Sequence, residues 1–205
     1  MSCKIIVVNY GIGNLASVKN MLNKVGADAS ISSCPKELLA ADKIILPGVG
    51  HFDHGMKMLK NSDLFSPLNS FALEMKKPVL GICLGAQMLG LSSEEGVLPG
   101  LGWIDMECKK LPTHSTLRVP HMGWNQIEIQ QNSKIFQEVV PNSRYYFVHS
   151  YYMKCKTVEN SAASTNHGID FSSVVVKENL YGTQFHPEKS LKHGMKLFDS
   201  FVNLC

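Results

Sequence analysis

The chain has 205 residues, which is long enough for one large domain with its own hydrophobic core. Hydrophobic residues make up 44% and charged residues 18% of the composition, as in ordinary globular proteins, which excludes a disordered or fibrous chain. The net charge of +3 comes from lysines scattered along the sequence, and this pattern does not favour nucleic acid as a partner.

The six cysteines and the N-terminal segment favour a cytoplasmic protein. The cysteines form no C-x-x-C pair, and no cluster of cysteine and histidine has the spacing of a zinc site. The chain opens with a strand-like run rather than a signal peptide, and no apolar stretch approaches the length that spans a bilayer. We therefore expect a cytoplasmic protein with reduced thiols, no bound metal and no membrane association.

The first half of the sequence alternates short apolar runs with amphipathic segments. The β-branched run at 4–8 predicts a buried parallel strand, and the glycine-rich turn after it leads into apolar residues at helical spacing over 15–25. The same reasoning predicts further strands at 29–32, 43–46 and 78–82, and helices at 52–60 and 64–76. Strands that alternate with helices in this way form a parallel sheet that is covered on both faces.

The pattern changes after Gly96, where short strands follow one another with turns between them. These strands are expected at 106–111, 125–129, 145–152, 162–165, 173–177 and 180–185, and a final helix is expected at 191–204. We therefore expect an α/β fold with an open, mostly parallel sheet, helices on both faces and an antiparallel extension. No linker or repeat divides the chain, so we expect a single domain of residues 1–205.

The segment at 78–87, Pro-Val-Leu-Gly-Ile-Cys-Leu-Gly-Ala-Gln, carries a candidate nucleophile. An apolar run leads into Cys83, which has glycines two residues away on both sides and is followed by a helix-compatible stretch. This order is typical of a nucleophile elbow, a strained turn that exposes the sulfur at a helix N-terminus, where the partial positive charge favours the thiolate. A buried core cysteine is the alternative, and this segment alone leaves both possibilities open.

His186 and Glu188 are candidates for the partners that a cysteine nucleophile needs. They lie two residues apart after the last predicted strand, so an extended backbone points both side chains the same way. An imidazole takes the thiol proton, and a carboxylate fixes the tautomer of the imidazole. The alternative is a histidine that caps the last helix and a glutamate that pairs with Lys189 or Lys192. We favour a triad with Cys83, because all three residues lie at the C-terminal ends of predicted strands, where open α/β sheets place their sites.

The segment Gly48-Val49-Gly50 follows the third predicted strand and is a candidate oxyanion hole. Its glycines leave backbone N–H groups accessible to a ligand. Together with the N–H of Leu84, these groups could stabilise a tetrahedral intermediate. A plain strand-to-helix turn is the alternative for a Pro-Gly-x-Gly sequence.

Three of these motifs together resemble the class I glutamine amidotransferases: residues 81–87, residues 47–50 and residues 186–188. Three further tracts narrow the resemblance to the glutaminase subunits of imidazole glycerol phosphate synthase, an enzyme of histidine biosynthesis. These tracts are Asn-Tyr-Gly-Ile-Gly-Asn at 9–14, Pro-His-Met-Gly-Trp-Asn at 120–125 and Tyr-Phe-Val-His-Ser-Tyr at 146–151. The resemblance covers nearly the whole chain, with the motifs in the family's order.

The resemblance implies a Cys-His-Glu glutaminase that works without a metal or cofactor. Cys83 would attack the side-chain amide of glutamine and form a glutamyl thioester, and His186 would pass the thiol proton to the leaving ammonia. Water would then release glutamate. The Gly48-Val49-Gly50 segment matches the oxyanion strand, which in this family must reorient to become active.

Four further positions match those that hold the glutamine substrate in this family. Gln87 and Glu95 match the positions at its α-amino end. Ser150 and Tyr151 match the positions that line its carboxylate. Without the resemblance, the first pair would be solvated helix and turn residues, and the second pair would be ordinary strand residues that face opposite sides.

A partner subunit is expected from the chemistry and from the resemblance. Ammonia released into water is mostly protonated and no longer nucleophilic, so a lone glutaminase would waste glutamine. The resemblance implies a heterodimer with a (β/α)8-barrel cyclase, which binds the nucleotide substrate and makes imidazole glycerol phosphate. The expected interface residues are Asn14, His121, Met122, Trp124 and Lys189. The alternative for Trp124 is a place in the core.

Three other functions remain open from the sequence. The same glutaminase could serve a different synthase, for instance one that amidates a sugar for a surface polysaccharide. A hydrolase or peptidase with a Cys-His pair and no partner is a second possibility, against which Gln87 and the tract at 120–125 argue. The third is a non-catalytic scaffold, against which the intact triad argues.

Overall fold

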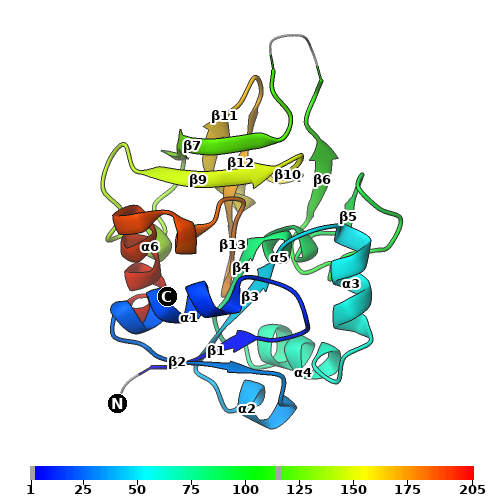
Figure 1. Ribbon diagram of the computed structural model, residues 1–205, viewed down its shortest axis with the longest axis vertical. Helices are drawn as coiled ribbons and strands as arrows, with labels where there is room; N and C mark the ends of the chain where they lie inside the picture. Colours follow the sequence, from blue (N-terminus) through cyan, green and yellow to red (C-terminus); the bar gives the residue numbers. More distant parts are fainter. Residues whose placement is uncertain (1–2, 114–116) are drawn as a thin grey trace.

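Buried apolar strands form the centre of the molecule, which the computed structural model describes over residues 3–113 and 117–205. Five strands lie side by side and parallel in the order β2-β1-β3-β4-β13 (Figure 1). Their bounds are Asp28–Ser32 (β2), Lys4–Val8 (β1), Lys43–Gly48 (β3), Val79–Cys83 (β4) and Leu180–Thr183 (β13). In β1, Ile6 packs into one core cluster and Ile5 into another, because neighbouring side chains of a strand point to opposite faces.

Helices cover both faces of this sheet (Figure 1). On one face, α2 to α5 contribute side chains such as Phe52 and Leu84 to the first core cluster. On the other face, α1 and α6 contribute side chains such as Leu22 and Phe198 to the second. The bounds are Leu15–Lys24 (α1), Pro35–Leu39 (α2), Phe52–Lys60 (α3), Phe65–Asn69 (α4), Leu84–Met88 (α5) and Leu191–Asn203 (α6). In the part of the chain described, none of these helices is long and apolar enough to cross a membrane.

Beyond β13 the sheet continues with mainly antiparallel strands. β12 (Asp170–Lys177) pairs antiparallel with β13 and with β10 (Tyr151–Cys155), and β10 pairs antiparallel with β6 (Met106–Lys110). The short β5 (Ser92–Ser93) lies at the end of this order, and β11 (Ser161–Asn166) pairs with β12 and with the short β8 (Glu128–Ile129). The predicted α/β fold, with a mostly parallel sheet, helices on both faces and an antiparallel extension, is confirmed.

A separate antiparallel ribbon of β7 (His121–Gln126) and β9 (Arg144–His149) crosses in front of β11 and β12 in Figure 1. The single strand expected at 145–152 is therefore wrong. The chain leaves the ribbon at His149, turns at Ser150 and enters the main sheet as β10. Phe147 packs into the core cluster on the α6 side and Met153 into the cluster on the other side, which requires the break between them.

Three smaller elements also differ from expectation. The strand expected at 125–129 begins earlier, as β7, and only the short β8 follows it. The helix expected at 64–76 is α4 followed by a π-helical turn at Ser70–Glu74. Helix α2 was not expected, because its five residues are too few to reveal a helical spacing of apolar side chains.

Candidate active site

Cys83 lies at the turn between β4 and α5 with a strained backbone. Its φ of 53° and ψ of −109° form a combination that residues other than glycine rarely adopt. A β-carbon added at Gly81 would lie 2.7 Å from Cα of Ala86. One added at Gly85 would overlap the carbonyl oxygen of Leu46. The two glycines therefore let α5 pack closely on β3 and β4, which is the geometry of a nucleophile elbow.

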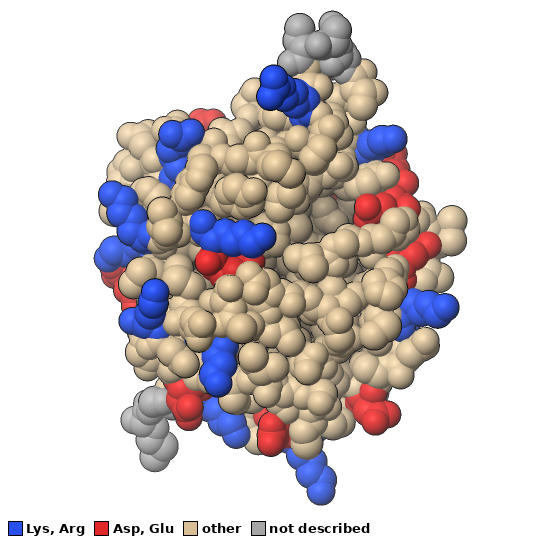
Figure 2. Space-filling view, viewed as in Figure 1, with Lys and Arg blue, Asp and Glu red and all other residues tan. Residues whose placement is uncertain are grey.

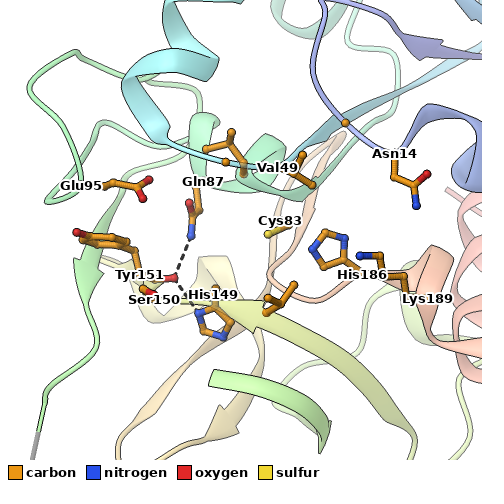
Figure 3. Close-up of a pocket in the computed structure, with 14 residues that line it drawn as sticks. Asn14, Val49, Cys83, Gln87, Glu95, His149, Ser150, Tyr151, His186 and Lys189 are labelled. Atoms are coloured by element: carbon orange, nitrogen blue, oxygen red, sulfur yellow. Dashed lines mark hydrogen bonds between the residues drawn. The ribbon is translucent and has the colours of Figure 1, made fainter. Parts of the chain in front are cut away.

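His186 and Glu188 meet at the turn that follows β13. Nδ1 of His186 lies 2.7 Å from Oε1 of Glu188, and both side chains are only 2% exposed. Because the carboxylate accepts the proton on Nδ1, the other ring nitrogen is free to face Cys83 (Figure 3). Within the described residues, this Nε2 atom has no formed hydrogen bond. Glu188 thus pairs with His186 rather than with a neighbouring lysine.

The surroundings of His186 favour its charged form. Burial lowers the pKa of His186, but the Cys83 sulfur and the Glu188 carboxylate outweigh burial and raise the pKa to about 10. An imidazole held in this way can take the thiol proton at Nε2 and keep it beside the sulfur. The arrangement is suited to a thiolate–imidazolium pair that attacks a carbonyl carbon.

The backbone at His186 is tied to the β7–β9 ribbon. The N–H of His186 donates to the carbonyl of Tyr146 at 2.9 Å, and the N–H of Tyr146 donates to Oγ of Ser190 at 3.0 Å. The Ser190 hydroxyl donates in turn to the carbonyl of His186 at 2.6 Å. This closed set of three hydrogen bonds fixes the turn, so the ribbon helps to place the candidate base.

A cavity of about 620 Å³ opens over Cys83 at the carboxyl ends of β3 and β4. Its lining is Gly13, Asn14, Val49, Gly50, Cys83, Leu84, Gln87, Glu95, Val148, His149, Ser150, Tyr151, His186 and Lys189 (Figure 3). All the catalytic, oxyanion and substrate residues predicted from the sequence are in this list except Gly48 and Glu188. On the face in Figure 2, most charged side chains lie toward the rim, but basic and acidic side chains also lie near the middle, beside the hollow.

The candidate oxyanion segment begins beside the sulfur. Gly48 is paired with Cys83 in the register of β3 and β4. A β-carbon at Gly48 would lie 2.6 Å from the backbone nitrogen of Gly85, so only glycine fits between the two elements. Val49 is 41% exposed, and Gly50 has a φ of 96°, which favours glycine. The segment therefore runs along the pocket wall next to the nucleophile.

Gln87 and Glu95 are held in place on one wall of the pocket. Nε2 of Gln87 donates to the carbonyl of Tyr151 at 3.0 Å (Figure 3). The same nitrogen also donates to Oε1 of Gln184 at 3.2 Å. Oε2 of Glu95 accepts the N–H of Phe52 at 2.8 Å. Gln87 is only 5% exposed, so it is not the solvated helix residue that the sequence left as an alternative.

Ser150 and Tyr151 lie at the break between β9 and β10, where the backbone turns into the pocket. His149 precedes them and also lines the pocket, although our sequence reasoning did not select it. Its Nδ1 lies 2.8 Å from the carbonyl oxygen of Tyr151 (Figure 3). Only its place beside Ser150 in the tract at 146–151 could have pointed to it.

The residues expected at a partner interface fall into an exposed group and a buried one. Met122 is 63% and Trp124 is 40% exposed, and they share one face of β7. The Trp124 ring meets the Tyr146 ring edge-on at 6.3 Å, and Nζ of Lys189 lies 5.8 Å from the centre of the Tyr146 ring. These side chains connect the ribbon to the pocket mouth. His121 is 4% exposed and points inward, so its side chain does not belong to this surface.

The fold is shared with a known class of enzymes. The sequence model of the family "Glutamine amidotransferase class-I" matches residues 6–204. The crystal structure of a glutamine amidotransferase is similar to this one, with a TM-score of 0.74 and 17% identity over 96% of each chain. PurLQS from Thermotoga maritima gives a TM-score of 0.71 and 18% identity over 99% of each chain. This protein belongs to the class-I glutamine amidotransferase family.

Curated relatives define the branch within that family. Imidazole glycerol phosphate synthase subunit HisH 2 of Pseudomonas aeruginosa is 50% identical over 98% of this chain and 99% of its own length. The HisH subunit of Methanosarcina acetivorans is also 50% identical, over 98% of this chain and 99% of its own length. The branch is therefore that of the HisH subunits of imidazole glycerol phosphate synthase, which confirms the resemblance drawn from the sequence.

Proposed function

We propose that this chain is the glutaminase subunit of an imidazole glycerol phosphate synthase in histidine biosynthesis. The Cys83 thiolate attacks the side-chain amide carbonyl of glutamine, and the tetrahedral intermediate expels ammonia as His186 gives it a proton. Water, with His186 as base, then hydrolyses the glutamyl thioester and glutamate leaves. Glu188 holds His186 in the tautomer that these steps require. The buried His186–Glu188 pair, with Nε2 facing Cys83 in the pocket, is the observation that carries the proposal.

We assign the developing oxyanion to backbone N–H groups. The N–H of Leu84 at the start of α5 and those of Gly48-Val49-Gly50 are the candidate donors. The pairing of Gly48 with Cys83 supports this assignment, since it brings the end of β3 next to the carbon under attack.

We assign the ends of glutamine to two walls of the cavity. Gln87 and Glu95 would receive the α-ammonium group, because Glu95 is a carboxylate in the lining and the carbonyl oxygen of Gln87 can accept a hydrogen bond. Ser150 and Tyr151 would receive the α-carboxylate through the backbone that turns at the strand break.

We propose a (β/α)8-barrel cyclase as the partner in a heterodimer, in which ammonia passes directly to the cyclase. The relatives are named as subunits of a synthase, which supports a second subunit. The interface would contain Met122 and Trp124 on the ribbon, with Asn14 and Lys189 at the pocket mouth. His121 would support this surface from behind.

We further propose a single domain of residues 1–205 and a cytoplasmic location. The pairing of β4 with β13, which are about a hundred residues apart in the sequence, supports one domain. All six cysteines are unpaired thiols, which supports a reducing compartment.

The test of the proposed function is the Cys83→Ala variant in the complex with the cyclase. We expect glutamine-dependent synthesis to fall by about 10³-fold or more, because the nucleophile is lost, while synthesis from added ammonium salts remains. Cys34→Ala, which changes an exposed cysteine outside the pocket, serves as the matched control and should leave both activities intact. Glutamate release by the Cys83→Ala variant at the wild-type rate would refute the assignment of the nucleophile.

A further inference from the structure

Two buried histidines that the proposed mechanism does not use lie against the pocket. His121 in β7 is 4% and His149 in β9 is 6% exposed. Nδ1 of His121 and Nε2 of His149 are 3.0 Å apart, which is hydrogen-bond distance. The His121 ring is stacked between those of Phe147 and His167, at centroid distances of 4.7 Å and 4.0 Å. The described part of the chain contains no group of three side chains that could hold a metal ion, so the pair calls for another explanation.

The contact between His149 and the pocket backbone determines which nitrogen of each ring carries the proton. Nδ1 of His149 is 2.8 Å from the carbonyl oxygen of Tyr151, and a carbonyl oxygen can only accept. Nδ1 of His149 must therefore carry a proton. In a neutral ring Nε2 is then an acceptor, and the hydrogen bond at 3.0 Å must come from Nδ1–H of His121.

The contact between His121 and Asn125, on the side away from the pocket, gives the same positions for the protons independently. Oδ1 of Asn125 accepts the N–H of Gln126 at 2.8 Å, and Nδ2 of Asn125 donates to the carbonyl of Asn166 at 2.9 Å. These two contacts fix the orientation of the amide, and they leave Nδ2 at 3.2 Å from Nε2 of His121. Nε2 of His121 therefore accepts, and its proton is on Nδ1. The two sets of contacts therefore agree: Asn125 donates to His121, His121 donates to His149, and His149 donates to the carbonyl of Tyr151.

The environment keeps both rings neutral, as this chain of hydrogen bonds requires. Burial and the nearby His121 lower the pKa of His149 to about 3. Burial and the nearby His167 lower the pKa of His121 to about 4. Near pH 7 each ring therefore has one donor and one acceptor nitrogen.

We propose that His121 is a positioning residue for the glutamine subsite, because its Nδ1–H fixes the tautomer in which His149 holds the Tyr151 carbonyl. The proposal rests on the proposed function, in which the backbone at Ser150 and Tyr151 receives the substrate carboxylate. Without the donor at His121, only the Tyr151 carbonyl still holds His149 in this tautomer, and the form with the proton on Nε2 becomes populated. The lone pair on its Nδ1 would then face the lone pairs of the Tyr151 carbonyl and push this backbone away.

The same carbonyl also places the opposite wall of the pocket. It accepts from Nε2 of Gln87 at 3.0 Å as well as from His149. A displaced Tyr151 would therefore disturb Gln87, while Cys83, His186 and Glu188 lie outside this set of hydrogen bonds. We expect His121 to act on the KM for glutamine more than on kcat.

The test compares three variants in the complex with the cyclase. His121→Phe keeps an aromatic ring in the stack and removes the donor, while His121→Asn keeps a donor close to the position of Nδ1. His167→Phe is the matched control, because it changes the ring stacked on the other side of His121 without entering the donor chain. The KM and kcat for glutamine are measured by glutamate release, and the tautomer of His149 is read from the nitrogen chemical shifts of ¹⁵N-labelled protein.

We expect wild type, His121→Asn and His167→Phe to have His149 protonated on Nδ1, with similar KM values. We expect His121→Phe to lower the share of this tautomer and to raise KM about tenfold, as the loss of one buried hydrogen bond would, with kcat changed less. A wild-type His149 protonated on Nε2, or a His121→Phe variant with unchanged KM, would overturn the inference. If wild type released no glutamate at all, the proposed function would fail instead, and the tautomer measurement would still decide whether His121 acts on His149.

Discussion

Single residues in this site depart from what stability alone would favour. Cys83 keeps a φ of 53° without being glycine, and Glu188 keeps a buried carboxylate whose Oε2 has no hydrogen-bond partner among the described residues. Features of this kind cost about 1–3 kcal/mol each and persist only where the surrounding structure holds them. Here they direct a sulfur and a ring nitrogen toward each other, which is what proton exchange between Cys83 and His186 requires.

The charge on His186 gives a prediction for the pH dependence of stability. The pKa of this histidine is raised to about 10 in the folded protein, against about 6.5 in an unfolded chain. Its stabilising contribution is therefore complete below pH 6.5 and is lost as the pH rises to about 10. Glu188→Gln removes the carboxylate at 2.7 Å and lowers this pKa, so unfolding free energies from urea titrations should fall less steeply with pH in the variant.

The control for this prediction is Glu178→Gln, which removes an exposed carboxylate that is paired with Lys76. This change should leave the slope of stability against pH between about 6.5 and about 10 as in wild type. Parallel curves for wild type and Glu188→Gln would show that the carboxylate does not set the charge of His186.

Lys43 gives a second prediction at this scale, about stability alone. Its side chain is 8% exposed, and Nζ donates to the carbonyls of Phe201, Val202 and Cys205 at 2.7–2.8 Å, where α6 ends. Lys43→Met would leave these carbonyls unpaired, and we expect a loss of about 2–4 kcal/mol in urea unfolding. Lys36→Met, which changes an exposed lysine on α2, should alter stability by less than about 0.5 kcal/mol. Equal losses in the two variants would contradict the capping role.

At the scale of elements, the pocket depends on where strands end. β3, β4 and β13 all end at the same edge of the sheet, and β9 gives way to β10 beside that edge. The break at Ser150 is as important as the elbow at Cys83, because a continuous strand would carry Tyr151 past the pocket. These parts of the site thus come from four chain segments that meet only in the folded sheet, and Gly13, Asn14 and Glu95 complete the lining from elsewhere in the chain.

The parts of the fold and site that were predictable from the sequence are those that depend on local pattern. The elbow at Cys83 and the spacing of His186 and Glu188 are local, and helix α3 begins and ends where its apolar spacing predicts. The break at Ser150 was not predictable, because it depends on which core each half of the segment joins. The contribution of His149 was also hidden, since its contact comes from His121, 28 positions away in the sequence.

The packing of α5 on β3 gives a prediction for this scale. A β-carbon at Gly85 would overlap the carbonyl oxygen of Leu46, so Gly85→Ala must push α5 and the end of β3 apart. We expect a loss of about 3 kcal/mol or more in unfolding free energy, together with reduced glutaminase activity. Gly26→Ala, at a φ of 86° with open space around it, should cost only about 1 kcal/mol and leave activity intact. Similar effects of the two changes would mean that α5 can shift without harm to the site.

At the scale of the whole molecule, the pocket mouth and the ribbon form one continuous surface. Lys189 lines the pocket and lies over the ring of Tyr146, which in turn meets Trp124 on β7. The backbone of Tyr146 also holds the turn that carries His186. A partner that covers the ribbon would therefore lie directly over the opening through which ammonia must leave.

This arrangement predicts that Trp124 anchors the complex with the proposed cyclase partner. Trp124 is 40% exposed and adds little to the core, so Trp124→Ala should leave thermal unfolding nearly unchanged. The loss of a central aromatic anchor should raise the Kd for the cyclase about 10–100-fold in a calorimetric titration. Val97→Ala, which changes an apolar side chain that is 92% exposed and outside the pocket lining, should bind as wild type does. If the two variants bound the cyclase equally well, the ribbon would not be the docking surface, and ammonia would have to reach the partner by a different route.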